Sequence, residues 1–310
     1  MGITVLGAVF VDIKGFPTTA YIPGGRNVGN VVQVHGGVSR NIAEDIGNIQ
    51  LKPNFLSIVD YSGTSTDVIS RLEEHGVCTR YMAREENGLG TWLAVFDNNG
   101  DVTASISKRP DLSKLVSVLD EKGDEIFSNS DSIALEIDME EEILARVFEL
   151  ADRYGKKVYA AVSNMSIAME RRNYLKRVGC LVCNLQEAEM LFSTDLEHVP
   201  TRELIAILKE KTAKARIAQL VVTLGPDGCI YTNGKESGHY PAYNVDVIDT
   251  TGAGDAFFAG TAIGLTYGKS LRESAIIGSR LAASVIATKE STCPNFMPEE
   301  FGIAHPKEDQ

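Results

Sequence analysis

One stretch decides the fold: Val247-Ile248-Asp249-Thr250-Thr251-Gly252-Ala253-Gly254-Asp255-Ala256-Phe257-Phe258-Ala259-Gly260. Its first residues are β-branched and predict a short strand that ends at Ile248, and the apolar residues after the small-residue turn predict a helix. Gly252 and Gly254 bracket the start of that helix and leave room for a ligand to approach the backbone. Because a helix start carries unpaired N–H groups and a partial positive charge, the turn suits an anion such as a phosphate.

Asp255 stands in the first turn of this predicted helix, where the anion is expected to bind. The field of the helix favours the ionised carboxylate, and an ionised carboxylate can take a proton from a hydroxyl that attacks a phosphate. A structural alternative also exists, because an acidic residue in the first turn stabilises a helix whatever the function. The turn by itself leaves both interpretations open.

The string Asp-Thr-Thr-Gly-Ala-Gly-Asp-Ala-Phe at 249–257 closely resembles the C-terminal signature of the ribokinase family, the PfkB-type carbohydrate and nucleoside kinases. The resemblance implies an ATP-dependent kinase in which Asp255 is the catalytic base. It also implies that the transferred phosphoryl group lies in a hole formed by Gly252, Ala253 and Gly254.

The composition is that of an ordinary globular chain. Of its 310 residues, 44% are hydrophobic and 23% are charged, which argues against long disordered regions and fits one large α/β domain or two small ones. The net charge of −12 disfavours a nucleic acid or an anionic membrane as a partner. No apolar run reaches the length of a membrane span and no secretion signal is visible at the N-terminus, so we expect a cytoplasmic protein.

Five cysteines are scattered through apolar segments, and an odd number of this kind is typical of a reduced, intracellular protein. Cys180 and Cys183 have the spacing of a zinc or redox pair. However, they lie in a predicted strand, where residues three apart point to opposite faces, and no second pair accompanies them. We therefore expect neither a metal nor a redox function for them.

Strand-like and helix-like segments alternate along the chain, which predicts an α/β fold with a mostly parallel central sheet and helices on both faces. The expected strands are residues 3–9, 54–59, 132–137, 157–162, 180–183 and 220–224. The expected helices are residues 39–48, 64–75, 139–154, 167–177, 201–215, 254–267 and 271–288. The ribokinase resemblance covers nearly the whole chain and implies a three-layer αβα kinase domain over residues 1–310.

Two segments interrupt the alternation, at about 12–35 and 90–107. The second contains two apolar runs around an Asn-Gly turn at 99–100, which is a hairpin signal. Such segments are also found as plain surface excursions. The resemblance implies a small β-sheet that forms a lid over the substrate and the interface of a homodimer. We expect Trp92, the only tryptophan, to serve packing or the interface rather than the substrate.

Candidate substrate-binding residues lie in the N-terminal part of the chain. Asp12 follows the first predicted strand, and sheets of this type bind ligands beyond the carboxyl ends of their strands, although an Asp there is also a common turn former. Gly36 and Gly37 allow close approach of a ligand, and Asn41 lies in the first turn of the next helix. A similar Gly-Gly-Arg-Asn segment at 24–27 has no helix pattern after it. The resemblance implies that Asp12 and Asn41 hold substrate hydroxyls.

The run Gly-Gly-Val-Ser-Arg-Asn-Ile-Ala-Glu at 36–44, preceded by a loop at 26–29, and the run at 91–97 resemble the pseudouridine kinase branch of the family. This resemblance rests mainly on residues 24–49 and 91–106. Two departures are that Val28 stands where a proline is expected, and that the hairpin ends in Ser-Lys-Arg-Pro at 107–110 rather than in an acidic motif. The branch implies transfer of the γ-phosphate of ATP to the 5′-hydroxyl of pseudouridine. A free sugar (ribose or fructose) or another nucleoside is the alternative acceptor, and a catalytically silent, ligand-sensing homologue is the rival from another class.

Candidate nucleotide and metal residues depend on the resemblance. Asn184 and Glu187 match the family pattern Asn-x-x-Glu, which organises Mg²⁺ and the phosphates, and Mg²⁺ needs few carboxylates. A monovalent cation, K⁺, is implied near Asp249 and Thr251. The remaining expected ATP contacts are Thr223, Gly225, Gly228 and Asn295, although an ordinary strand-to-hairpin turn also explains Gly228.

Other nucleotide-binding classes lack support in the sequence. The chain contains no Gly-x-x-x-x-Gly-Lys-[Ser/Thr] phosphate loop and no protein-kinase catalytic loop. The segment at 7–12, after the first predicted strand, does not supply the glycine fingerprint of a dinucleotide-binding dehydrogenase. These three classes are therefore excluded.

Overall fold

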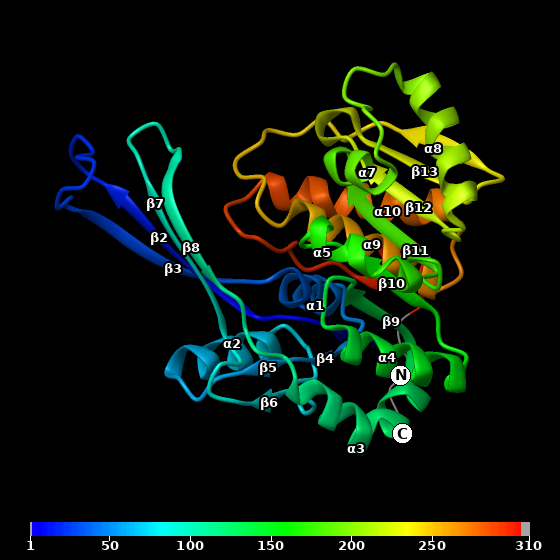
Figure 1. Cartoon of the computed structure of the whole chain (residues 1–310), viewed down its shortest axis with the longest axis horizontal. Coiled ribbons are helices and arrows are strands. Elements are labelled where there is room, and N and C mark those ends of the chain that lie inside the picture. The colour runs from blue at the N-terminus through cyan, green and yellow to red at the C-terminus, as the bar shows by residue number, and fades with distance from the viewer. Residues whose placement is uncertain (1, 305–310) are drawn as a thin grey trace.

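An eight-stranded sheet forms the centre of the molecule in the computed structural model, which describes residues 2–304 (Figure 1). Its strand order is β14-β13-β12-β11-β10-β9-β1-β4. All neighbours pair in parallel except at one edge, where β13 and β14 are antiparallel. The strands are β1 (Gly2–Leu6), β4 (Asn54–Leu56), β9 (Ser130–Glu136), β10 (Val158–Ala161), β11 (Cys180–Asn184), β12 (Leu220–Thr223), β13 (Cys229–Thr232) and β14 (Ser237–Tyr240). The predicted mostly parallel sheet is confirmed.

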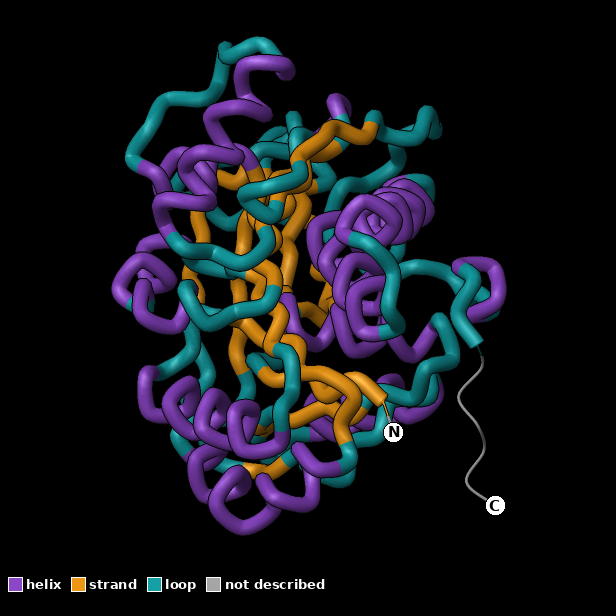
Figure 2. The backbone as a smooth tube through the Cα atoms, turned by 90° about the vertical axis from the view of Figure 1, so that its right-hand side faces the viewer, coloured by secondary structure: helices purple, strands orange, loops and turns teal. Residues whose placement is uncertain are grey.

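Helices cover both faces of this sheet, so the fold has the three expected layers (Figure 2). One buried apolar cluster joins one sheet face to α1 (Val38–Asn48), α2 (Gly63–Glu74), α9 (Ala253–Thr266) and α10 (Leu271–Ile286). A second cluster joins the other face to α3 (Lys114–Ser128), α4 (Glu141–Tyr154), α5 (Met165–Glu170), α6 (Arg172–Leu175), α7 (Leu185–Phe192) and α8 (Thr201–Ala215). Two 3₁₀ turns, η1 (Gly225–Asp227) and η2 (Pro298–Phe301), complete the elements.

Helix α9 is apolar on nearly all sides because it is buried between the sheet and α10. Its backbone lies against that of α10: a Cβ atom at Gly260 would stand 2.7 Å from the backbone nitrogen of Gly278. This close packing fixes the position of the N-terminal turn of α9, which carries Asp255.

A separate four-stranded sheet, the lid, extends from the main body (Figure 1). Its strand order is β3-β2-β7-β8, with β2 and β7 parallel and both outer pairs antiparallel. The strands are β2 (Phe10–Pro17), β3 (Gly29–Gly36), β7 (Gly90–Phe96) and β8 (Val102–Lys108). A two-stranded sheet of β5 (Ile58–Val59) and β6 (Ala83–Arg84) lies beside its base. The lid predicted from the two interrupting segments is confirmed.

Several expected boundaries are wrong. Residues 247–248 form no strand; their connection to α10 is a single backbone bond from the Ile248 N–H to the Ile286 carbonyl, 2.7 Å. The first strand ends at Leu6, so Asp12 lies on lid strand β2 rather than at the end of β1. The expected helix at 167–177 is broken into α5 and α6, and α3 was not predicted.

The two cysteines with metal-like spacing point to opposite faces of β11, as predicted: Cys180 belongs to one apolar cluster and Cys183 to the other. Both thiols are free and buried, and burial raises the pKa of each. Over residues 2–304, no cluster of three or more His, Cys, Asp and Glu side chains is arranged to hold a metal ion, and no helix is long and apolar enough to cross a membrane.

Candidate active site

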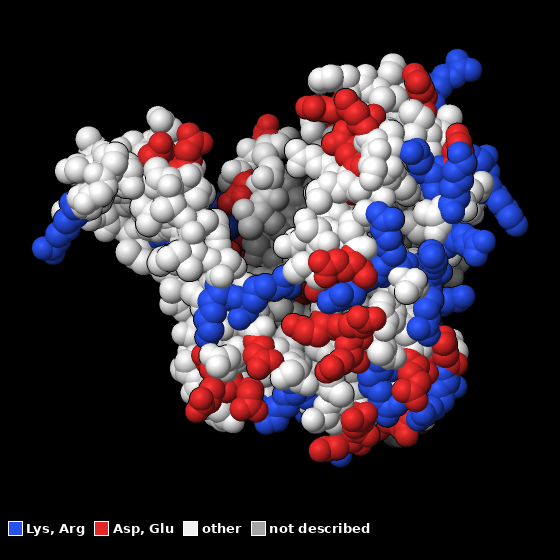
Figure 3. Space-filling view, in the orientation of Figure 1, with Lys and Arg blue, Asp and Glu red and all other residues white. Residues whose placement is uncertain are grey.

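A cavity of about 680 Å³ lies between the lid and the carboxyl-terminal edge of the central sheet, where Figure 3 shows the molecule hollowed. The lid contributes Asp12, Lys14 and Trp92 to its wall, and the body contributes Asn41 and Asp255. Gly36, Gly37 and Gly252 also line it. The structure thus brings together all the residues that the sequence predicted for the substrate.

A second cavity, of about 490 Å³, lies on the other side of the glycine turn. Thr223, Gly225 and Gly228 line it, together with Ala253 and Gly254. Its remaining wall is largely apolar and includes Tyr243, Phe257, Ala282 and Ile286. Asn295 lines neither large cavity, so the structure does not bring it to the other predicted ATP contacts.

A small space of about 190 Å³ touches the same turn. It is lined by Asn184, Glu187 and Thr223 and also by Gly254 and Asp255. The turn at the start of α9 therefore borders all three spaces, and the Asp255 side chain borders two of them. A group held in the second cavity can therefore meet a group held in the first cavity at this turn.

The two glycines of the turn differ in their surroundings. Gly252 has φ 82°, and a Cβ atom there would stand 1.9 Å from the carbonyl oxygen of Ser291, so backbone conformation and packing both require glycine. A Cβ atom at Gly254 would meet no heavy atom within 4 Å. Packing therefore does not explain Gly254, whereas close approach of a ligand to the free N–H groups of the helix start does.

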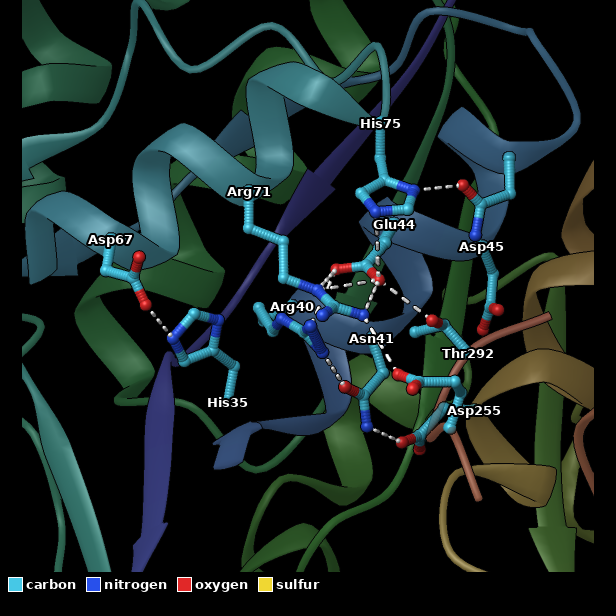
Figure 4. Close-up of polar contacts among 12 residues, drawn as sticks. His35, Arg40, Asn41, Glu44, Asp45, Asp67, Arg71, His75, Asp255 and Thr292 are labelled. Atoms are coloured by element: carbon cyan, nitrogen blue, oxygen red, sulfur yellow. Dashed lines mark hydrogen bonds and ion pairs between the residues drawn. The ribbon is translucent and has the colours of Figure 1, made fainter. Parts of the chain in front are cut away.

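Asp255 accepts a hydrogen bond from the Asn41 side-chain amide, with 2.7 Å between Nδ2 and Oδ2 (Figure 4). Burial raises the pKa of Asp255 to about 7, helped by the negative charge of Glu136 and opposed by the Asn41 hydrogen bond and the Arg40 charge. Desolvation therefore outweighs the effects that favour the ionised carboxylate, among them the field of the helix. A carboxyl group that titrates near neutrality is well suited to general base catalysis.

Asp12 and the adjacent glycines form one wall of the first cavity. A Cβ atom at Gly36 would stand 3.1 Å from Asp12 Oδ1, so the glycine leaves room for the carboxylate. Gly37 adopts φ 103° immediately before α1, and a Cβ there would stand 2.7 Å from the Ala8 carbonyl oxygen. Burial raises the pKa of Asp12, while the charges of Lys14 and Arg40 oppose this effect.

Trp92 lies directly opposite Asp12 in the lid register and lines the substrate-side cavity. Its ring packs edge-on against Phe96, with 6.4 Å between ring centroids. Alternate lid residues face the cavity, so the aromatic side chain of Trp92 is presented to whatever the cavity holds. Trp92 therefore both packs within the lid, as expected, and lines the cavity.

Asn184 and Glu187 form a capping box at the start of α7, with Glu187 N to Asn184 Oδ1 at 2.9 Å and Asn184 N to Glu187 Oε2 at 2.8 Å. This explains the Asn-x-x-Glu pattern structurally. The Glu187 carboxylate also lines the small space beside Asp255, and burial raises its pKa. A single partly exposed carboxylate next to the glycine turn is of the kind that Mg²⁺ can use, since this ion keeps several of its waters.

Asp249 and Thr251 lie in the exposed turn before α9 and line the first cavity. Asp249 Oδ1 accepts a hydrogen bond from the Thr251 N–H at 2.8 Å, and this bond lowers the pKa of Asp249. An ionised carboxylate and a hydroxyl are oxygen donors of the kind that a cation requires.

The sequence did not identify two buried groups of this site. Glu136 ends β9, and its Oε1 accepts hydrogen bonds from the N–H groups of Ala8 (3.2 Å) and Ser39 (3.1 Å). Its position at the carboxyl end of a central strand was a usable signal. Arg40 is 1% exposed, and nothing in the sequence indicated that it would be buried beside Asn41.

Comparison with known proteins agrees with this geometry. Residues 2–298 match the pfkB family of carbohydrate kinases. The chain is 32% identical over 292 residues to a guanosine-inosine kinase of Exiguobacterium acetylicum, covering 93% of this chain and 95% of that protein. It is 24% identical over 276 residues to the pseudouridine kinase of Escherichia coli K12, covering 87% of each.

Solved structures show the same fold. A ribokinase of Arabidopsis thaliana complexed with ribose and ATP superposes with a TM-score of 0.82 at 19% identity, over 97% of this chain and 98% of that one. The family match spans nearly the entire chain and includes every residue of the three cavities described above. The chain therefore belongs to the pfkB family of carbohydrate kinases, phosphotransferases that use ATP with Mg²⁺ and act on an alcohol group.

Proposed function

We propose that this protein is a nucleoside kinase that transfers the γ-phosphate of ATP to the 5′-hydroxyl of a purine nucleoside of the guanosine and inosine type. The full-length similarity to the guanosine-inosine kinase, at 32% identity, supports this choice over pseudouridine, for which the similarity falls to 24%. The comparisons thus favour our alternative acceptor, another nucleoside, over the pseudouridine expected from residues 36–44. Pseudouridine remains the second candidate.

The observation that carries the proposal is the position of Asp255 between two cavities that meet at the glycine turn. With the nucleoside in the first cavity and ATP in the second, Asp255 takes the proton of the attacking hydroxyl. The amides of Gly252, Ala253 and Gly254 at the start of α9 face the developing phosphate charge. The large apolar part of the second cavity suits the adenosine of ATP.

The first cavity offers separate contacts for the ribosyl group and the base. On the side of the cavity nearest Asp255, the Asp12 carboxylate can accept hydrogen bonds from ribose hydroxyls, and the Asn41 amide can donate to them. Trp92 and Phe10, both in its wall, offer flat apolar surfaces against which a base can stack. These aromatic groups favour a nucleoside, whose planar base can stack on them while its ribose reaches Asp12 and Asn41, over a free sugar, which has no base.

The same geometry supports proposals for the metal ions. We propose that Glu187 holds Mg²⁺ through water, where the ion neutralises phosphate charge, and that Asp249 and Thr251 contribute to a K⁺ site. Asn295 lines neither large cavity, so a contact between Asn295 and the base or ribose of ATP requires its loop to move. The free cysteines support a reducing, cytoplasmic setting. The family match over residues 2–298 supports one kinase domain over the whole chain.

We also propose a homodimer formed through the lid. The lid register places Val31, Leu93 and Ile106 on the face opposite to Asp12 and Trp92. These three apolar side chains are 74%, 41% and 71% exposed. An apolar sheet face of this kind is a site of association, and a second copy of the same face is the partner that we propose.

The test is to incubate the purified protein with Mg-ATP and K⁺ and to measure ADP release with guanosine, inosine, adenosine, uridine, pseudouridine, ribose and fructose. We expect turnover with guanosine and inosine and a phosphorus NMR signal of a 5′-monophosphate. Turnover with pseudouridine alone would reverse the order of the two candidates. Turnover with a free sugar alone would contradict the nucleoside proposal, and bound ATP without turnover of any acceptor would favour a ligand-sensing homologue.

A further inference from the structure

Arg40 is a buried cation beside the candidate active site, and the proposed function gives it no role. It lies in the first turns of α1 and is 1% exposed. Figure 4 shows its guanidinium between two side chains of the same helix. Nη1 donates to Asn41 Oδ1 at 2.5 Å, and Nη2 donates to Glu44 Oε2 at 2.6 Å. Burying a guanidinium is costly unless it is paired, so a position of this kind requires an explanation.

The contact with Asn41 decides which way the Asn41 amide points. A side-chain amide has an oxygen that only accepts and an NH₂ group that only donates, and a simple flip exchanges them. Arg40 has donors only, so it can pair with the amide oxygen and not with the NH₂ group. The NH₂ group must then lie on the other side, where it donates to Asp255 Oδ2 at 2.7 Å.

We propose that Arg40 is a positioning residue of the phosphoryl-transfer site, which acts by holding the Asn41 amide in the orientation that presents its NH₂ group to Asp255. In the flipped orientation the amide oxygen would face the carboxylate, and two acceptors would repel each other. Asp255 would then lose both its fixed rotamer and its hydrogen-bond donor. The inference rests on the role of Asp255 in the proposed function, but not on which nucleoside is the acceptor.

Arg40 is itself held in place by a buried network that spans three parts of the chain. Glu44, which is fully buried, also accepts from Arg71 Nη2 of α2 at 2.9 Å and from the Thr292 hydroxyl at 2.8 Å (Figure 4). These partners outweigh the effect of burial and lower the pKa of Glu44, so its carboxylate is ionised. The Arg40 guanidinium therefore has one fixed anion on one side and the Asn41 oxygen on the other.

The charges around Asp255 give Arg40 a second, measurable effect. Arg40 and Asn41 of α1 lower the pKa of Asp255, while Glu136 of β9 and burial raise it. Asp45, also on α1, is a second acidic group nearby, and the negative charge of Asp255 raises the pKa of Asp45. Arg40 is thus the cation that opposes the carboxylates, and its removal moves the acidic limb of the activity profile to higher pH.

A double-mutant cycle on kcat/KM tests the inference with Arg40→Met, Asn41→Ala and the combined variant. The cycle is measured on the alkaline plateau of each variant, where the pKa shift of Asp255 does not contribute. If Arg40 acts through Asn41, each single variant loses roughly 10–100-fold there, and the combined variant is no worse than Asn41→Ala alone. If the losses of the two single variants multiply in the combined variant, Arg40 acts independently of Asn41 and the inference is overturned.

Arg40→Lys keeps the charge and serves if Arg40→Met does not fold. A single ammonium group does not reproduce the fixed fork that reaches Asn41 and Glu44 together, so we expect a partial loss of kcat/KM with the acidic limb near its wild-type position. Unchanged kcat/KM in Arg40→Lys and Arg40→Met would overturn the inference.

Arg177→Met is the matched control, because Arg177 pairs with Asp152 and lines none of the three cavities. It is expected to keep wild-type kcat/KM and pH profile; a loss equal to that of Arg40→Met would show that the effect is not specific to Arg40 and would overturn the inference. Asp255→Asn separates this inference from the proposed function. If that variant keeps its turnover, Asp255 is not the base and the proposed function fails. If Asp255→Asn is inactive but the losses of Arg40→Met and Asn41→Ala multiply in the combined variant, only the Arg40 inference is overturned.

Discussion

At the scale of single residues, the proposed chemistry depends on one carboxyl group whose surroundings oppose its ionisation. Asp255 sits at a helix start that favours the anion, yet burial and Glu136 raise its pKa to about 7. A base with this pKa is half protonated near neutrality. The hydrogen bond from Asn41 and the charge of Arg40 keep enough of it ionised to accept a proton from a hydroxyl.

The first prediction is an acidic limb in the activity profile. Because the ionised form of Asp255 is the base, kcat/KM should be constant above about pH 8 and should fall tenfold per pH unit well below pH 7. The measurement is kcat/KM for the nucleoside from pH 5.5 to 9 at saturating Mg-ATP. A flat profile down to pH 5.5 would show that Asp255 titrates much lower or is not the base.

The second prediction is that Asp255→Asn lowers kcat by roughly 10²–10⁴-fold and leaves ATP binding intact. The same substitution should raise stability above pH 7. A raised folded-state pKa contributes stability below the ordinary Asp pKa, and that contribution is lost as pH rises through about 7, where the buried carboxylate ionises. Thermal unfolding at pH 5 and pH 8 checks this: the gain in Tm of Asp255→Asn over wild type should be larger at pH 8.

The third prediction compares the two glycines of the turn. Gly254→Ala adds a methyl group in open space, so Tm should hold while kcat/KM falls roughly 10–100-fold, because the methyl group displaces the bound phosphate. Gly252→Ala meets the Ser291 carbonyl at φ 82° and should lose about 1–3 kcal/mol of stability as well. Equal losses of Tm in both variants would mean that Gly254 is there for folding and not for the ligand.

At the scale of elements, the same residues serve the fold and the site. The capping box of Asn184 and Glu187 starts α7 and also places a carboxylate in the small space beside Asp255. The packing of α9 against α10 buries an apolar helix and also fixes the turn that carries the base. An experiment on such a residue must therefore distinguish a destabilised helix from weaker ligand binding.

The fourth prediction makes that separation at Glu187. Glu187→Gln retains an oxygen that can accept the Asn184 N–H, so α7 should be preserved, but the lost charge should raise the Mg²⁺ concentration for half-maximal activity severalfold. Glu187→Ala also removes the acceptor of the Asn184 N–H, one of the two hydrogen bonds of the capping box, and should cost about 1 kcal/mol more in stability. Equal Mg²⁺ requirements for Glu187→Gln and wild type would remove Glu187 from the metal site.

The order of strands and helices in the core was predictable from the sequence, because continuous apolar strands and amphipathic helices have distinct periods. The errors share a physical cause in tertiary contacts. Residues 247–248 have strand propensity but find no sheet neighbour, only one backbone bond to Ile286. Helix α3 was missed although its buried Leu115, Leu119 and Ile126 follow helical spacing.

The predicted site residues came from motifs, and most of them meet at one turn. The residues that were missed carry no local signal. Arg40 would be read as a surface cation of an amphipathic helix, and only the fold supplies the Glu44 and Asn41 partners that allow its burial. The raised pKa of Asp255 could not be anticipated either, since it depends on burial and on Glu136, which is distant in sequence.

At the scale of the whole molecule, the lid has two faces with two tasks. The face that carries Asp12 and Trp92 lines the first cavity, and in the proposed function its movement over the substrate excludes water from the transferring phosphoryl group. The opposite face carries Val31, Leu93 and Ile106 and is exposed in the single chain. The alternation of side chains along the lid strands thus couples substrate coverage to the proposed association of two copies.

The fifth prediction concerns that association. Light scattering on the eluting protein should give about twice the chain mass of 33.6 kDa for wild type and a single chain mass for Val31→Asp/Ile106→Asp, because charges on the outer lid face oppose its burial in a dimer. Met190→Asp places the same charge on an exposed apolar position of α7 and should leave the mass unchanged. If the double variant elutes at the wild-type mass, the contact lies elsewhere on the molecule. The monomeric variant should also show a higher nucleoside KM with less change in kcat, since its lid strands lose the partner that steadies them over the cavity while Asp255 and the glycine turn are untouched.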